Sequence, residues 1–453
     1  MPALSSFQVL RVLDFEGCRD LQNHHISNAG SLFHLRHLGL RNTKITILPK
    51  EIGNLNYLHI LDLKQTSISY LPPTVIRLRQ LMCLYIEPSV ILPDGIGNLE
   101  SLQLLSFVGV SSSANFATEL GNLTELRTLH ISLIGTWHES HKNCLVESLC
   151  KLKKIQELHI DSTGVSTDFI VHLAWVPQYL KEFSGNVPRL PRWMNSLLSD
   201  LTTMIITVNM VRQEDIQNLG GLPFLQFLCL TVLSIDSAEE RTTIGTHGAN
   251  FHSLCEFHIQ IDSMGFFFAQ GAMPKLETLE VTFIVQKRKD VYGDFDLGLE
   301  NLFSIKQVIA RIRCTGSTVH EVDYADFAMR KAAGLNHNHP KLEVIRYYED
   351  KMVKDVLQYN KKTLKEEEKE EISLGPSEFL KEVSGTYGPF SPLPNVITSL
   401  TLVTNLDSYG PYGQPTGTPF HTRVDRTGTI VGFFGRSGMY LNAIGVYVLP
   451  SES

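Results

Sequence analysis

The segment ILPKEIGNLNYLHILDL, residues 47–63, holds both halves of a repeating unit, and this unit predicts the fold of the larger part of the chain. Its last six residues, LHILDL from Leu58, follow the pattern L-x-x-L-x-L. This alternation predicts a short strand whose apolar side chains point inward while the intervening side chains point outward. Before the strand, Pro49 begins a return segment, and Ile52 of that segment points back into the same core. One such unit cannot bury its apolar face alone, so the segment predicts similar units on either side.

The hexamer recurs along the first three quarters of the chain. Clear copies begin at Leu10, Leu35, Leu58, Leu81, Leu102, Leu126 and Ile155, with spacings of 25, 23, 23, 21, 24 and 29 residues. Looser copies begin at Leu180, Leu201, Leu225, Leu254, Leu276 and Ile305. A spacing in the twenties with this hexamer is the signature of leucine-rich repeats. We therefore expect an α/β leucine-rich-repeat solenoid, or horseshoe, over residues 1–348.

The particular residues that fill the repeats are also informative. LRVLDFEGC from Leu10 and LPKEIGNL from Leu48 resemble the leucine-rich region of intracellular plant immune receptors, over about residues 1–350. The resemblance implies a defence role in which the solenoid recognises a pathogen protein or a host protein. Such receptors carry an upstream nucleotide-binding switch with a G-x-x-x-x-G-K-[ST] loop, and this sequence has no such loop. We therefore expect the recognition region of such a receptor without its nucleotide-binding switch.

The outward positions of the hexamers form the predicted partner-binding concave face, because rigid curved arrays suit large partners. The side chains assigned to this face are polar and carry both signs of charge. They are Arg11, Arg36, His37, His59, Asp62, Tyr85, Arg127, His130 and His159. For any single member, a solvated surface position with no binding role is the alternative.

Composition and spacing argue against several other classes of function. The formal charge of −7 gives no general reason to bind nucleic acid or an anionic membrane. No run of apolar residues is long enough to span a bilayer, and no secretory leader is evident, so we expect a cytoplasmic protein. No catalytic set stands out, so we expect no enzyme and no cofactor. His130, His159 and His258 share one hexamer position, but His258 lies too many repeats away for a common metal site.

A change of composition marks a second region. Residues 349–371 are strongly charged and predict a linker or helix, with an acidic docking segment as the alternative. Residues 372–453 are rich in β-forming residues and resemble a jacalin-related, mannose-type plant lectin in the blocks SLGPSEFLKEVSGTYGPF, VITSLTLVTN, YGPYGQPTGTPF and GFFGRSGMYLNAIGVYV. That family folds as a β-prism. These residues are too few for the whole of it, so we expect a truncated all-β lectin domain whose open strand edges need cover.

The resemblance also places a sugar-binding loop at Gly438, Met439, Tyr440 and Asn442. Family members carry a carboxylate where this chain has Asn442, and a carboxylate makes stronger, charge-assisted bonds to sugar hydroxyls than an amide does. We therefore expect mannose binding to be weak or lost, and the domain to be kept as a surface. There are two alternatives: the lectin domain is a decaying pseudogene remnant, or it retains weak mannose binding. The leading hypothesis is thus a protein-recognition module, and the other is a mannose-type lectin with the solenoid as its scaffold.

Overall fold

The structure is a computed structural model of the 453-residue chain. It divides into two compact units, Met1–Val353 (unit 1) and Lys354–Ser453 (unit 2), and each is described by itself. The residues described are 7, 9–110, 115–134, 139–173, 175–233, 242–245, 250–261, 266–285, 297–353, 374–375, 377–390, 393–424, 428–437 and 441–450. Most of the predicted charged linker, residues 354–371, lies outside them, while Glu349–Lys351 form a short 3-10 helix, η11.

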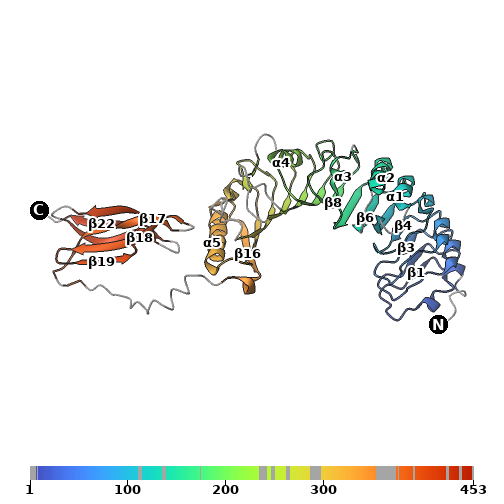
Figure 1. The fold of residues 1–453 in the computed structure, drawn as a ribbon, viewed down its shortest axis with the longest axis horizontal. Coiled ribbons are helices and arrows are strands. Elements are labelled where there is room, and N and C mark those ends of the chain that lie inside the picture. The colour runs from blue at the N-terminus through green and yellow to red at the C-terminus, as the bar shows by residue number, and fades with distance from the viewer. Residues whose placement is uncertain are drawn as a thin grey trace. The chain divides into compact units, whose positions relative to one another are not determined.

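Unit 1 is built on one parallel sheet, which contains fourteen strands within the described residues. In order across the sheet they are β1 (Val12–Asp14), β2 (His37–Gly39), β3 (Ile60–Asp62), β4 (Cys83–Tyr85), β5 (Leu104–Gly109), β6 (Thr128–Ile134), β7 (Glu157–Thr163), β8 (Glu182–Val187), β9 (Thr203–Val208), β10 (Phe227–Val232), β12 (Glu256–Ile261), β14 (Thr278–Ile284), β15 (Gln307–Arg313) and β16 (Lys341–Tyr347). Strands β11 (Thr242–Ile244) and β13 (Phe266–Phe268) form a small separate pair. Figure 1 shows the strands side by side along the unit. The predicted solenoid is confirmed, and β16 extends it by one strand beyond the last predicted hexamer.

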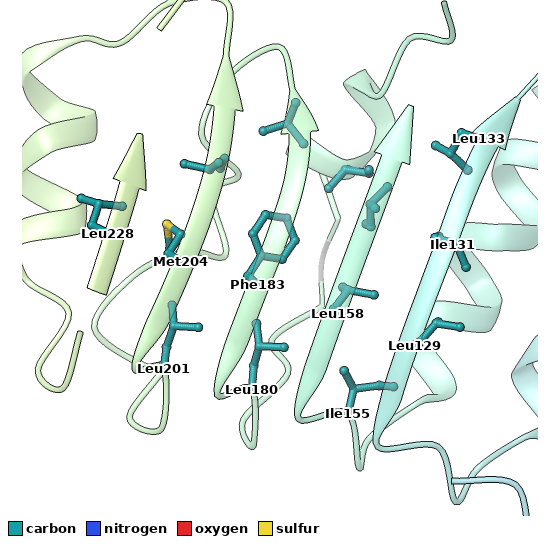
Figure 2. Packing of buried hydrophobic residues seen from close by; sticks show 14 of the residues in the cluster. Leu129, Ile131, Leu133, Ile155, Leu158, Leu180, Phe183, Leu201, Met204 and Leu228 are labelled. Atoms are coloured by element: carbon teal, nitrogen blue, oxygen red, sulfur yellow. The ribbon is translucent and has the colours of Figure 1, made fainter. Parts of the chain in front are cut away.

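The inward side chains of neighbouring strands stack into a continuous core (Figure 2). Leu129 is in register with Leu158, Leu158 with Phe183, and Phe183 with Met204, which is in turn in register with Leu228. All five are fully buried. Burial of one such side chain stabilises the fold by about 1.5–3 kcal/mol, so each strand depends on its neighbours for most of its stability.

The return segments of unit 1 contain 3-10 turns in the early repeats and a mixture of α-helices and 3-10 turns in the later ones. The compact early repeats use 3-10 turns, which rise further per residue than an α-helix. These are η2 (Asn23–His25), η3 (Ala29–Ser31), η4 (Lys50–Asn54), η5 (Pro73–Arg77), η6 (Ile96–Asn98) and η8 (Leu120–Asn122). Later repeats add α1 (Phe116–Glu119), α2 (Glu139–Lys151), α3 (Asp168–Val171), α4 (Gln213–Gly220), η10 (Leu299–Asn301) and α5 (Val319–Leu335). The long spacing between Leu126 and Ile155 accommodates the 13 residues of α2.

Neighbouring early returns touch through their backbones. A Cβ atom on Gly53, in η4, would lie 2.5 Å from the carbonyl oxygen of Thr74 in η5. Glycine at this place in the repeat therefore allows a close approach of the two returns that a side chain would prevent.

One predicted inward residue points the other way. The hexamer from Leu102 predicts that its last residue, Phe107, enters the core. Instead, Phe107 has a positive φ of 56°, and the register between β5 and β6 shifts by one residue there. Phe107 is 39% exposed, while Val108 is fully buried in its place. This β-bulge turns an aromatic ring onto the open face of the sheet.

Unit 2 is antiparallel. Its strands are β17 (Leu380–Phe390), β18 (Leu393–Thr404), β19 (Ser408–Gly413), β20 (Thr418–Arg423), β21 (Gly428–Ser437) and β22 (Leu441–Pro450). They run in the order β19-β18-β17-β21-β22, with β20 paired to β17. The carboxylate of Glu378 ties the start of the unit together, because it accepts hydrogen bonds from the Gly375 amide, the Thr404 hydroxyl and the Tyr409 hydroxyl. Among its described hydrophobic side chains only Val383, Val396 and Ile430 are buried.

Candidate functional site

The open face of the unit 1 sheet, opposite the core, is the concave face of the sequence prediction, and it holds five of the predicted partner-binding residues. His37 and Asp62 lie on β2 and β3, Tyr85 on β4, and His130 and His159 on β6 and β7. The remaining four, Arg11, Arg36, His59 and Arg127, each lie one residue before a strand. Their backbones form a ladder at that edge, with the Arg36 amide donating to the Arg11 carbonyl at 2.7 Å. The structure therefore separates the predicted set into a sheet face and a sheet edge.

An ion pair occupies the first part of the face. Nε and one terminal nitrogen of Arg41 lie 2.9 Å and 2.8 Å from Oδ2 of Asp62. The other carboxylate oxygen of Asp62 accepts from the Lys64 amide at 3.0 Å. The hydrogen bond to Asp62 raises the pKa of Arg41. The charge of Asp62 is thus already balanced by Arg41 within the chain. Sequence reasoning missed this pair, because Arg41 lies after its strand rather than in the hexamer.

Beside this pair, a row of contacts crosses four further strands. The Lys64 ammonium lies 4.6 Å from the ring centroid of Phe107 and 5.5 Å from that of Tyr85. Phe107 meets His130 edge to face at 5.2 Å between centroids, and His130 meets His159 at 4.0 Å. We call Lys64, Tyr85, Phe107, His130 and His159 the aromatic stripe. Sequence reasoning found three of its members and missed Lys64 and Phe107.

The imidazole of His130 is neutral at physiological pH. Burial, His159 and Lys64 together lower its pKa to about 4, with burial the largest cause. Both ring nitrogens are covered, and neither has a hydrogen-bond partner within the described residues. Burial also lowers the pKa of His159, although Glu182 opposes this from 3.5 Å. The stripe is therefore an aromatic surface with Lys64 as its cation.

A second polar cluster lies on the same face toward the end of the sheet. Arg311 on β15 pairs with Glu280 on β14, with contacts of 2.5 Å from Nε and 3.1 Å from a terminal nitrogen. Arg311 also donates to the hydroxyl of Tyr347 on β16. These three residues line a shallow hollow of about 370 Å³ together with Gln260, Thr282, Arg313 and Tyr348. The sequence prediction named none of them, because the late hexamers are too irregular for their outward positions to stand out.

Of the three histidines at one hexamer position, His258 does not join His130 and His159. His258 on β12 pairs with Glu256 at 2.7 Å, and three strands separate β12 from β7. Within the described residues no group of three His, Cys, Asp or Glu side chains has the arrangement of a metal site. The search for membrane-spanning helices, made over the same residues, found none of sufficient length and apolarity.

The predicted sugar-binding loop cannot be placed. Gly438, Met439 and Tyr440 lie outside the described residues, and of Asn442 the structure describes only its backbone position in β22. The reduced sugar affinity expected from an amide at Asn442 stays a prediction.

Comparison with protein families places both parts of the chain. A model described as a leucine-rich repeat region matches residues 1–342. The chain belongs to the leucine-rich repeat family. A model described as a jacalin-like lectin domain matches residues 331–447, so this leucine-rich repeat protein ends in a jacalin-like domain of the β-prism type. The lectin match begins within α5, which the structure assigns to unit 1. Both families are non-catalytic folds.

Individual relatives agree with this division. The leucine-rich repeat part is 29% identical over 337 residues to disease resistance protein RGA5 of Oryza sativa subsp. japonica, covering 70% of this chain and 29% of that protein. The lectin part is 47% identical over 78 residues to the jacalin-related lectin Calsepa of Calystegia sepium, covering 17% of this chain and 50% of the lectin. A crystal structure of Calystegia sepium agglutinin matches with 45% identity, covering 18% of this chain and 52% of that chain, at a TM-score of 0.17. This chain therefore spans less than a third of the resistance protein and about half of these lectins.

Proposed function

We propose that this leucine-rich repeat protein is a plant defence-related recognition protein that docks a partner protein on the open face of its parallel sheet. The similarity to a rice disease resistance protein supports the defence role. The partner is a pathogen protein or a host protein. We infer that it acts in the cytoplasm, and that neither nucleic acid nor a membrane is its target, since the chain is acidic overall.

The observation that carries the proposal is the contact of Phe107 with His130. A bulge costs the sheet regular pairing, yet here it moves a large aromatic side chain out of the core and onto the open face. Aromatic side chains held on strands lose little conformational freedom when they bind, and they dominate the energy of many interfaces.

Site-specific photo-crosslinking in plant extract tests the proposal. A photoreactive phenylalanine analogue at Phe107 should capture a defined protein, and capture should fall when Lys64→Glu is added. The matched control places the same analogue at Phe33, which is 56% exposed and lies in a return segment rather than on a strand. Equal products from both positions, or none from Phe107, would contradict docking on the open face.

A second candidate function is the binding of a mannose-type glycan by the jacalin-like domain. The 46% identity over 89 residues to a mannose/glucose-specific lectin of Parkia pendula favours it. Retention of the full chain on mannose resin, compared with its Asn442→Asp variant, separates the possibilities. Stronger retention of the variant would support a weakened sugar site, and equal, firm retention of both would favour the lectin function.

A further inference from the structure

A hollow of about 480 Å³ lies between three consecutive return segments of unit 1. Helix α3 lines one part of it, the segment 189–194 after β8 lines the second, and the start of α4 lines the third. None of its lining residues lies on a strand or belongs to the aromatic stripe, so it is separate from the open face of the sheet. Its volume is in the range of sites that bind small molecules, about 300–1,000 Å³.

The floor of the hollow is apolar and belongs to the core of the solenoid. Val171, Leu190, Met194 and Leu219 line it, and all four are buried. The Arg192 amide donates to the Val171 carbonyl at 3.3 Å, which joins α3 to the segment after β8. Because its floor is packed core, the hollow keeps its shape before any ligand enters.

The exposed side chains around this floor include three arginines. They are Arg189, Arg192 and Arg212. Arg212 lies 3.7 Å from the carboxylate of Glu214. Neither Arg189 nor Arg192 forms an ion pair with any carboxylate of the described residues. Their guanidinium groups therefore keep their N–H donors for a ligand.

Two carboxylates of the hollow already accept hydrogen bonds within the chain. Asp168 accepts from the Ser166 hydroxyl at 2.5 Å. Asp215 accepts from the Arg212 amide at 2.8 Å, at the start of α4. Burial raises the pKa of Asp215, while the Arg212 amide and the charge of Arg189 oppose this shift. The hydrogen-bonding capacity that is left over is therefore mostly that of donors, which favours a ligand with an anionic group.

The lining of the hollow has as many carboxylates as arginines. A compound with many phosphates would meet repulsion as well as attraction, whereas a compound with one phosphate and several hydroxyls matches both kinds of side chain. We propose that this hollow binds a small phosphorylated polyol. Arg189 and Arg192 bind the phosphate, because guanidinium groups pair with phosphate oxygens through two parallel hydrogen bonds. The hydroxyls donate to Asp168 and exchange hydrogen bonds with the amide of Asn218.

Isothermal titration calorimetry of the full chain with sorbitol 6-phosphate tests this proposal. We expect saturable binding of one ligand per chain. Unphosphorylated sorbitol should bind at least about 10-fold more weakly, because it lacks the charge-assisted bonds of the phosphate. Gluconate, which has a carboxylate on a six-carbon chain, should fall between the two. The measurement does not depend on the docking function proposed for the open face.

Substitutions of the arginines locate the ligand in the hollow. Arg189→Gln and Arg192→Gln should each weaken the binding of sorbitol 6-phosphate by about 10- to 100-fold. Arg192→Lys keeps the charge but should still weaken binding, because an ammonium group cannot make the two parallel contacts. Arg79→Gln is the matched control, since this side chain is 64% exposed and lies outside the hollow, and it should leave the affinity unchanged.

Circular dichroism and melting temperatures should show that all these variants are folded, because the substituted side chains are exposed. A wild type that binds sorbitol 6-phosphate no more tightly than sorbitol overturns the proposal. Unchanged affinity in both Arg189→Gln and Arg192→Gln overturns it too, since the ligand would then bind elsewhere, for example in the jacalin-like domain. Tighter binding of gluconate than of sorbitol 6-phosphate would contradict the assignment of a phosphate.

Discussion

Phe107 meets His130 edge to face on the open side of the sheet, with ring centroids 5.2 Å apart and ring planes at 80°. In this geometry the positive edge of one ring approaches the negative face of the other, which is favourable for aromatic pairs. The contact exists because β5 has one residue more than β6 between matched positions. It links Lys64 on one side to His159 on the other, and so joins separate outward residues into one surface.

The bulge predicts effects of different size on stability for two adjacent residues. Phe107→Ala should lower the free energy of unfolding by less than about 1 kcal/mol, because the ring is on the surface. Val108→Ala should lower it by about 1–3 kcal/mol, because it leaves a cavity in the core. Urea denaturation followed by circular dichroism gives both values. A loss of about 3–5 kcal/mol for Phe107→Ala would mean that the ring is in the core after all.

The depressed pKa of His130 predicts a pH-dependent stability. The unfolded chain binds a proton at this imidazole near its ordinary value, whereas the folded chain binds it only at a pKa of about 4. Stability is therefore full above about pH 6.5 and falls as the pH drops from there toward about 4. His130→Phe should remove part of this fall, worth about 1–2 kcal/mol after allowance for solvent screening. Urea midpoints at several pH values measure it, and identical pH profiles for the two proteins would refute the assignment.

Glu119 at the end of α1 caps the preceding return segment. Its carboxylate accepts from the Gly95 amide at 2.9 Å and from the Gly97 amide at 3.2 Å. Hydrogen bonds to a charged acceptor are strong, so Glu119→Ala should reduce the free energy of unfolding by about 1.5–3 kcal/mol. Glu100→Ala, at a 76% exposed side chain, should change it by less than about 0.5 kcal/mol. Similar values for the two variants in thermal or urea unfolding would show that the cap contributes little.

Substitution of Gly53 tests the close approach of the early returns, with Gly334 as the control. Gly53→Ala would place a methyl group 2.5 Å from the Thr74 carbonyl oxygen, so we expect a loss of about 1–3 kcal/mol from forced backbone movement. Gly334→Ala, in α5, meets no atom within 4 Å and should stabilise the protein by about 0.4–1 kcal/mol. Melting temperatures of the two variants should thus move in opposite directions. If Gly53→Ala melts like the wild type, the returns are less tightly packed than the structure has them.

The repeat, the direction of most side chains and the change of fold after unit 1 can be predicted from the amino-acid sequence alone. Leucines at a fixed spacing have one efficient way to bury themselves, which is to stack strand on strand, so positions such as Leu61 and Leu84 are inward for a local reason. Likewise, the change from repeat pattern to Gly-rich β sequence marks unit 2 without reference to its packing. The alternation of side chains along a strand also predicted that Tyr85 and His130 lie on the open face.

Which outward residues meet depends instead on contacts between repeats in the folded chain. A bulge at Phe107 depends on how β5 is held in register with β6, and this register is set by contacts between repeats rather than within one. The pairing of Arg41 with Asp62 and of Arg311 with Glu280 is also decided between repeats, because each pair joins residues of two neighbouring repeats. The exposure of Val448 and Leu449 on β22 is also a tertiary property, since it depends on which described strands lie beside them and not on their own apolar character.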